Sequence, residues 1–118
     1  MGRLRRLFLV GIFALTFLAF LPSLDGQFVN WDDLDNFVKN TSYRGLGWPQ
    51  LTWMWTEPWF GHYLPITAMT LGLNYELGGM DPWGYHLGNL LIHAANAVLF
   101  FFVAATLLAA GGAREPGL

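Results

Sequence analysis

The sequence contains no cysteine, so neither a disulfide framework nor a thiolate metal site can form. Charged residues are also scarce, at 12% of the chain against about 25% in an ordinary soluble domain. No phosphate-binding glycine loop, zinc-protease motif or nucleophile elbow occurs, and no basic stripe suits a nucleic acid. These absences exclude nucleic-acid binding and the common signatures of soluble enzymes. The sequence is instead rich in long apolar runs, with 54% hydrophobic residues.

The first apolar run covers residues 7–24 and follows a basic tail, residues 1–6, with three arginines. As a helix it would be about 27 Å long at 1.5 Å per residue, close to the roughly 30 Å of a bilayer core. A cleavable signal peptide begins in the same way, but residues 21–25 (Leu-Pro-Ser-Leu-Asp) offer no small-x-small cleavage site. We therefore expect an uncleaved transmembrane helix.

The second apolar run, residues 84–110, contains no Asp, Glu, Lys or Arg and is long enough to cross a membrane with some tilt. Arginines lie in the N-terminal tail and, as Arg114, in the C-terminal tail of residues 111–118, whereas the loop of residues 25–83 is acidic. Cytoplasmic flanks are enriched in Lys and Arg. We therefore expect both termini in the cytoplasm and the loop outside, with a bacterial inner membrane as the location.

The loop between the two runs contains all six tryptophans, which is unlike a disordered linker. The tryptophans suit the headgroup region of a membrane, and we expect most of them to form an aromatic belt there. Residues 32–39 and 64–77 could each form a short helix, and the second has apolar residues at helical spacing. The sequence thus predicts an all-α membrane protein, with two transmembrane helices joined by a structured outer loop that contains short interfacial helices.

Two adjacent carboxylates, Asp32 and Asp33, lie soon after the first apolar run. Such a pair at a membrane surface can bind a divalent cation, such as Mg²⁺ or Mn²⁺, or act as a general base. The same pattern is also typical of a solvated acidic turn, and spacing alone does not choose between these roles.

A polar stripe lies on the second predicted span. Its members occupy one face of a helix because they are spaced by three, four and three residues: His86, Asn89, His93 and Asn96. Polar groups in hydrocarbon face other protein or water, so the stripe predicts further transmembrane helices as partners. Hydrogen bonds between helices explain it without catalysis. We expect His86, near the outer end of the span, to meet a ligand.

Three other loop residues are candidates for binding a substrate or a lipid. His62 and Tyr63 precede the predicted helix of residues 64–77, whose N-terminus could help them to bind a phosphate. Arg44 could contact lipid headgroups at the membrane surface. Membrane lipid is therefore an expected partner.

Three motifs of the chain, in their order and spacing, resemble a known family. They are Phe28-Val29-Asn30-Trp31-Asp32-Asp33, then His62-Tyr63-Leu64-Pro65-Ile66-Thr67 with Leu73-Asn74-Tyr75, and the most specific, Gly79-x-Asp81-Pro82-x-Gly84-Tyr85-His86-Leu87-x-Asn89-Leu90-Leu91-x-His93. Together they are similar to the N-terminal part of the tetratricopeptide-repeat membrane O-mannosyltransferase-like proteins, of the C-type glycosyltransferase superfamily. The resemblance covers residues 7–108.

The resemblance implies an enzyme that transfers a sugar from a polyprenyl-phosphate donor to an acceptor hydroxyl on the outer face. It implies that an acidic residue of the first outer loop acts as a base or metal ligand, a place that Asp33, and nearly equally Asp32, occupies. His62 and Tyr63 match a segment whose sequence in the family is usually Tyr-Arg-Pro. Here Leu64 replaces the arginine that would suit the donor phosphate. His86 matches the family's Tyr-His pair.

The superfamily's members cross the membrane many times, whereas this sequence has two predicted spans. We therefore expect a fragment of a larger C-type glycosyltransferase bundle that is inactive alone. The alternative is a non-enzymatic two-span membrane subunit whose outer loop binds a partner or a lipid headgroup.

Overall fold

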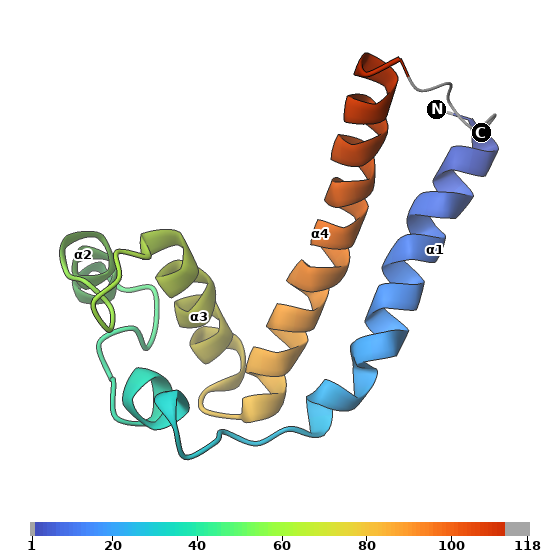
Figure 1. The fold of residues 1–118 in the computed structure, drawn as a ribbon. Helices are drawn as coiled ribbons and strands as arrows, with labels where there is room; N and C mark the ends of the chain where they lie inside the picture. The colour runs from blue at the N-terminus through green and yellow to red at the C-terminus, as the bar shows by residue number, and fades with distance from the viewer. Residues whose placement is uncertain (1, 113–118) are drawn as a thin grey trace. The chain divides into compact units, whose positions relative to one another are not determined.

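In the computed structural model, which describes residues 2–112, four α-helices account for most of the chain and no β-strand is present (Figure 1). The helices are α1 (Arg3–Phe20), α2 (Trp48–Thr56), α3 (Pro65–Gly78) and α4 (Pro82–Ala110). A short 3-10 helix, Leu21–Asp25, continues α1, and Leu34–Val38 forms a single π-helical turn. The predicted all-α class is confirmed.

The chain divides into two compact units, which are described separately. The membrane unit contains residues 2–23 and 89–112, and the loop unit contains residues 24–88. Two helical segments, Arg3–Asp25 and Pro82–Ala110, are long and apolar enough to cross a membrane. Both predicted spans are therefore present as helices, each beginning a few residues earlier than the apolar run that predicted it.

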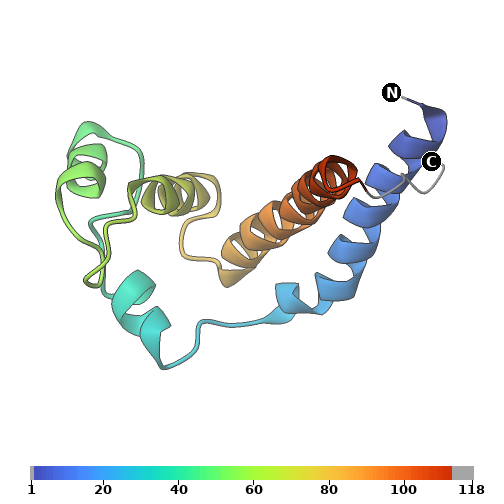
Figure 2. The same ribbon diagram turned by 45° about the horizontal axis from the view of Figure 1, so that its top comes forward.

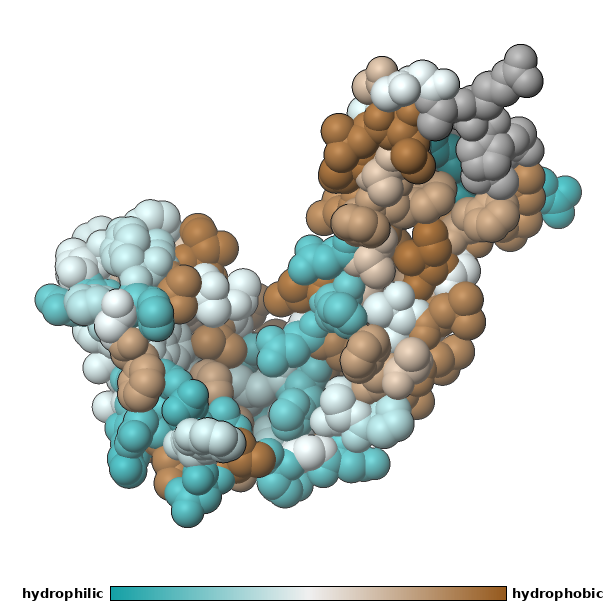
Figure 3. Space-filling model, viewed as in Figure 1, coloured by the Kyte–Doolittle hydropathy of each residue, from teal (hydrophilic) through white to brown (hydrophobic). Residues whose placement is uncertain are grey.

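Within the membrane unit, α1 runs antiparallel to the later part of α4. The guanidinium of Arg5 lies 5.3 Å from the ring centroid of Phe102, and the rings of Phe20 and His93 pack edge to face at 4.9 Å. No residue of α1 is buried, and its exposed side chains are apolar apart from three arginines at its start: Arg3, Arg5 and Arg6 (Figure 3). An apolar helix that is exposed on all sides is suited to lipid rather than to water.

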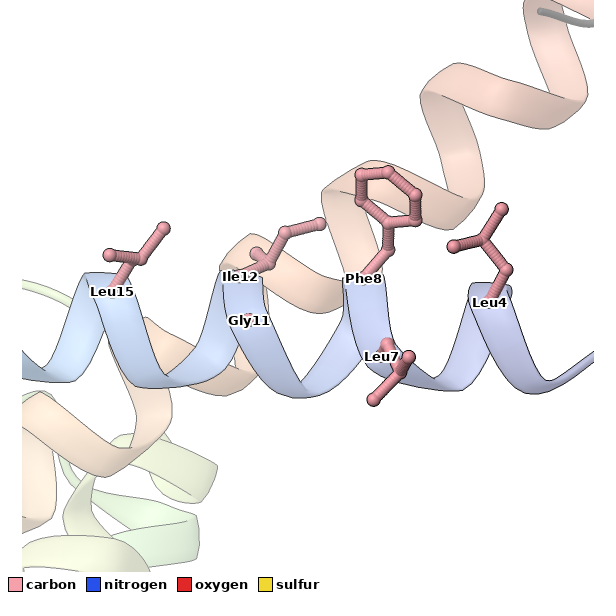
Figure 4. A pocket seen from close by; sticks show the side chains of 6 residues that line it. All are labelled: Leu4, Leu7, Phe8, Gly11, Ile12 and Leu15. Atoms are coloured by element: carbon pink, nitrogen blue, oxygen red, sulfur yellow. The ribbon is translucent and has the colours of Figure 1, made fainter. Parts of the chain in front are cut away.

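An apolar groove follows α1, lined only by residues of that helix: Leu4, Leu7, Phe8, Gly11, Ile12 and Leu15. Figure 4 shows Leu4, Phe8, Ile12 and Leu15 extending from one side of the helix and Leu7 from the other. Spacings of four and three residues place those four on one face. The groove offers no hydrogen-bonding or charged side chain, so it is not a site for chemistry.

The loop unit has a core of its own, built largely from aromatic rings. Its buried members are Tyr43, Met54, Trp59, Ala68, Leu71 and Tyr85, with the partly buried Phe28, Phe37 and Trp53 among the residues packed against them. The rings of Tyr43 and Trp59 stack with centroids 5.1 Å apart. Burying one large apolar side chain contributes about 1.5–3 kcal/mol. Two of the six tryptophans, Trp53 and Trp59, thus belong to this core and not to an aromatic belt.

Helices α2 and α3 lie side by side in the loop unit, as both ribbon views show (Figures 1 and 2). Gly72 of α3 allows the loop before α2 to approach closely, since a Cβ atom there would lie 2.7 Å from the carbonyl oxygen of Gly45. Gly45 has a φ of 111°, which favours glycine. The backbone N–H of Leu46 donates to Oε1 of Glu76 at 3.1 Å. These contacts attach the loop around Gly45 to α3.

The helices of the loop unit differ in part from the prediction. α3 matches the predicted helix of residues 64–77, and its buried residues are Ala68, Leu71 and Gly72. Of the apolar residues whose helical spacing predicted it, Met69 packs against the core, whereas three are exposed: Ile66, Leu73 and Leu77. The predicted helix of residues 32–39 is present as a short helical segment over residues 32–38, of which Leu34–Val38 is π-helical. α2 was not predicted.

Candidate functional site

The acidic segment after the first span is folded into a tight turn. The backbone N–H of Val29 donates to Oδ2 of Asp33 at 3.0 Å, and that of Trp31 donates to the carbonyl oxygen of Val29 at 2.8 Å. Asp33 is half-buried. Asp32 is exposed and, within residues 2–112, makes no hydrogen bond or ion pair. The two carboxylates therefore differ: Asp33 holds the turn, and Asp32 is open to a ligand.

A third carboxylate, Asp35, lies on the π-helical turn and is already paired. Lys39 donates to its Oδ1 at 2.7 Å, and both side chains are exposed. Among the described residues, no group of three or more His, Cys, Asp or Glu side chains is placed to hold a metal ion. Carboxylate oxygens suit Mg²⁺. Two aspartates, one of them bonded to the backbone, do not complete a site, so the Mg²⁺ or Mn²⁺ site stays a prediction.

His62 lies in a two-residue hairpin turn. The backbone N–H of Trp59 donates to the carbonyl oxygen of His62 at 2.7 Å, and the reverse bond measures 2.8 Å. Phe60 and Gly61, between them, have positive φ angles of 49° and 80°. Turns of this kind require positive φ at both central residues. The imidazole of His62 is exposed, so it is free to meet a ligand.

Tyr63, next in the chain, uses its hydroxyl inside the loop unit. Its Oη donates to the carbonyl oxygen of Trp55, near the end of α2, at 3.0 Å. The ring itself is exposed. This bond ties the turn to α2. Because the hydroxyl proton is used in it, the hydroxyl can accept a hydrogen bond from a substrate but not donate one.

Arg44 is engaged with the backbone of the loop. Its Nη2 donates to the carbonyl oxygens of Phe37 at 3.2 Å and Val38 at 2.7 Å, and its guanidinium lies 5.8 Å from the ring centroid of Tyr75. Its Nε is buried without a hydrogen-bond partner in the described chain. Arg44 thus stabilises the end of the π-helical turn, and the expected contact with lipid headgroups stays a prediction.

A buried tyrosine pair joins the loop to the first turn of α4. The hydroxyls of Tyr43 and Tyr85 are 2.7 Å apart, and Sδ of Met80 lies 3.4 Å from the first. Burial raises the pKa of Tyr43 above its ordinary value, although the hydrogen bond with Tyr85 and the charge of Arg44 act in the opposite direction. The pair fixes the start of α4, and with it the neighbouring His86.

The polar stripe of α4 has few partners in the described chain. Nε2 of His86 is buried and has no hydrogen-bond partner there. Asn89, His93 and Asn96 are exposed and make no hydrogen bond with the described residues, although His93 packs on Phe20. The four side chains follow one face of the helix as predicted, and their need for hydrogen-bonding partners is unmet within residues 2–112.

The predicted site residues do not form one hydrogen-bonded cluster. No hydrogen bond within residues 2–112 joins Asp32 or Asp33 to the side chains of His62, Tyr63 or His86. Sequence reasoning missed the strained turn at Phe60 and Gly61, because Phe-Gly is not one of the dipeptides that usually signal such a turn. It also missed the pairing of Tyr43 with Tyr85, which no local pattern reveals.

Comparison with known proteins identifies relatives for most of the chain. Protein O-mannosyl-transferase Tmtc1 of Drosophila melanogaster is 36% identical over 108 residues, which cover 85% of this chain and 12% of that protein. Protein O-mannosyl-transferase TMTC4 of Mus musculus is 32% identical over 111 residues, again 85% of this chain and 14% of the relative. This chain is related to the membrane O-mannosyltransferase-like proteins. The predicted family is therefore confirmed.

The relationship has a defined extent. The chain spans 12–14% of the length of these two relatives. Over a shorter stretch of 49 residues it is 43% identical to protein O-mannosyl-transferase tmtc2 of Xenopus laevis. No family model matches the chain, and no solved structure matches it. The expected bacterial inner membrane stays a prediction, as does the orientation with both termini in the cytoplasm.

Proposed function

We propose that this chain contributes the first outer loop of a membrane glycosyltransferase, which transfers mannose from a polyprenyl-phosphate donor to a hydroxyl group of a protein. One observation carries the proposal: in a relative of the protein O-mannosyl-transferases, Asp32 is an exposed carboxylate with no partner in the described chain. It lies seven residues along the chain from Asp25, where a helix that can cross the membrane ends. A lipid-linked donor keeps its phosphate at the membrane surface, so an acceptor base must lie close to a span.

The proposed reaction is an inverting displacement at the anomeric carbon. Asp32 takes the proton of the acceptor hydroxyl while the oxygen of that hydroxyl bonds to the anomeric carbon. At the same time, the bond between this carbon and the donor phosphate oxygen breaks. Polyprenyl phosphate leaves with the bonding electron pair. The work of Asp32 is thus to hold one proton at one carboxylate oxygen, for which an exposed and unpaired group is suited.

Asp33 has a different part in this proposal. Its Oδ2 accepts the Val29 N–H and thereby holds the turn that presents Asp32. The sequence alone favoured Asp33 for the chemical role, with Asp32 nearly equal. The hydrogen bond supports the reverse assignment, with Asp33 as a positioning residue. We derive no step through a divalent cation, because the described residues supply no third side-chain ligand.

Binding of the donor phosphate is assigned to histidine and tyrosine side chains. His62 is exposed beside the N-terminal end of α3, and His86 has a buried Nε2 without a partner in the described chain. Each can donate a hydrogen bond to a phosphate oxygen. Tyr63, whose hydroxyl proton is used by Trp55, would serve by packing its exposed ring on the substrate.

Further transmembrane helices complete the proposed enzyme. Asn89, His93 and Asn96 expose hydrogen-bonding groups on a helix that can cross the membrane. Each such group is costly in hydrocarbon unless protein or water satisfies it. Helices of the same or another chain that carry polar side chains would meet this need, and without them we expect no transfer.

The test is mannose transfer in membranes that contain the whole gene product. Membranes with the wild-type protein, Asp32→Asn or Asp35→Asn receive polyprenyl-phosphate mannose labelled in the sugar, and O-linked label in protein is counted. Asp35 is the matched control, because it is an exposed carboxylate in the same segment and pairs with Lys39. We expect Asp32→Asn to lower transfer at least 100-fold, within the range for loss of a general base, and Asp35→Asn to stay within twofold of wild type.

Two outcomes would count against the proposal. Transfer by Asp32→Asn at the wild-type rate would remove the base from the mechanism. Absence of label with the wild-type protein, despite its full insertion in the membrane, would favour the alternative, a non-enzymatic subunit whose outer loop binds a partner.

A further inference from the structure

An exposed apolar surface covers the end of α2, the hairpin turn and the start of α3. The residues on this 55–66 segment that expose large apolar side chains are Trp55 (50% exposed), Phe60 (59%), Tyr63 (60%), Leu64 (44%) and Ile66 (63%). The bond from Tyr63 to Trp55 holds the turn against α2, so these side chains share one region. Apolar surface of this kind on a folded unit marks an interaction site.

Phe60 makes the turn strained without adding to the core. It is the one non-glycine residue with positive φ in the described chain, a backbone conformation that is strained for a bulky L-residue. Asparagine or glycine would fit this turn better. The neighbouring Trp59 is buried and anchors the turn, whereas the ring of Phe60 projects from it. The turn therefore carries an aromatic ring at its exposed tip, where the ring makes no contact with the core and is available to a partner outside the unit.

Two further facts identify that partner as the lipid bilayer. The loop unit is joined at both ends to helices that can cross a membrane, so it stays at the membrane surface. Between Glu57 and Glu76 the sequence has no Asp, Glu, Lys or Arg, so most of the segment and α3 can enter the headgroup region without burying a charge. Tyrosine and tryptophan are enriched at that depth.

We propose that the 55–66 segment inserts into the membrane surface, with Phe60 at its tip entering the boundary between headgroups and acyl chains. This is a second membrane attachment of the loop, separate from the two spans, and its test does not depend on transferase activity. Because the segment has no basic residue, its insertion depends on apolar contact rather than on anionic lipids. It would hold the acidic turn of the loop at a fixed height over the bilayer.

The absence of cysteine in the chain allows a direct measurement of depth. Phe60→Cys, Ile66→Cys and the control Thr52→Cys, an exposed polar position on α2, are each labelled with a nitroxide. The whole protein is then reconstituted in phosphatidylcholine vesicles. Collisions of the nitroxide with oxygen, which concentrates in lipid, are compared with collisions with a water-soluble nickel chelate. We expect the ratio of oxygen to nickel accessibility at positions 60 and 66 to exceed that at position 52 at least fivefold.

Two further comparisons vary the charge of the lipid and the side chain at position 60. The ratio at position 66 should be unchanged by adding phosphatidylserine or salt, and should fall at least twofold when Phe60→Asn is combined with Ile66→Cys. Since asparagine suits the turn, this variant keeps the fold. High nickel accessibility at position 60 would overturn the proposal. So would shielding from both reagents, which would mean that protein covers the segment, or an unchanged depth in Phe60→Asn.

Discussion

At the scale of single residues, the two neighbouring aspartates Asp32 and Asp33 have different surroundings. Asp33 is half-buried and accepts the Val29 N–H, whereas Asp32 is exposed and has no partner in the described chain. A carboxylate that bonds to the backbone organises the chain, and one that faces solvent can meet a substrate. The assignment of roles therefore depends on a single hydrogen bond of 3.0 Å.

The role of Asp33 can be separated from a chemical one by two substitutions. Asp33→Asn keeps an oxygen that can accept the Val29 N–H, so we expect mannose transfer within fivefold of wild type. Asp33→Ala removes the acceptor, and transfer should fall at least tenfold because Asp32 is no longer held in place. Both are measured by the same sugar-transfer assay. Equal and severe losses in the two variants would show that the charge of Asp33 itself takes part in the reaction.

At the scale of secondary-structure elements, α3 is the centre of the loop unit. Its inner face packs on α2 and on the loop around Gly45, and Gly72 lets the backbones approach. The space beside Gly72 is closed by backbone oxygens, 2.7 Å and 3.0 Å from where a Cβ atom would lie, and backbone cannot easily move away. Close packing at this point therefore depends on the missing side chain.

Alanine substitutions at two glycines of α3 test this packing. Gly72→Ala should lower the free energy of unfolding of the loop unit by about 1–3 kcal/mol, as overpacking does. Gly78→Ala is the matched control, because nothing lies within 4 Å of its Cβ position. There the better helix propensity of alanine should be neutral or add up to about 1 kcal/mol. Urea unfolding in detergent, followed by tryptophan fluorescence, measures both. Equal stability of the two variants would contradict the packing.

The sequence predicted the elements better than their contacts. Pro65 and the Gly78-Gly79 pair correctly marked the ends of α3, whereas its buried face was not predicted because apolar residues occur on both sides of the helix. α2 was missed because its nine residues are too few to show a clear helical periodicity of apolar side chains. The carboxylate pair was found, but the bond to Val29 depends on a backbone conformation that spacing does not encode.

At the scale of the whole molecule, two apolar helices flank a folded, acidic loop along the chain. The helices Arg3–Asp25 and Pro82–Ala110 make the chain an integral membrane protein, in line with its relationship to the membrane O-mannosyltransferase-like proteins. The side-chain contacts between α1 and α4 are antiparallel, so the start of α1 and the end of α4 lie on the same side of the membrane unit. The arginines before the first span predict that this side is the cytoplasm. Every proposal for Asp32 requires the loop on the opposite side.

Labelling of single cysteines in intact cells tests this arrangement most directly. Thr52→Cys lies in the loop and Gly2→Cys in the N-terminal tail, and the chain has no other cysteine. With a membrane-impermeant maleimide, we predict that position 52 reacts in intact cells, or in sealed vesicles whose lumenal side is accessible. Position 2 should react only after the membrane is opened. Reaction of position 2 without permeabilisation, with position 52 protected, would place the loop in the cytoplasm and contradict the account.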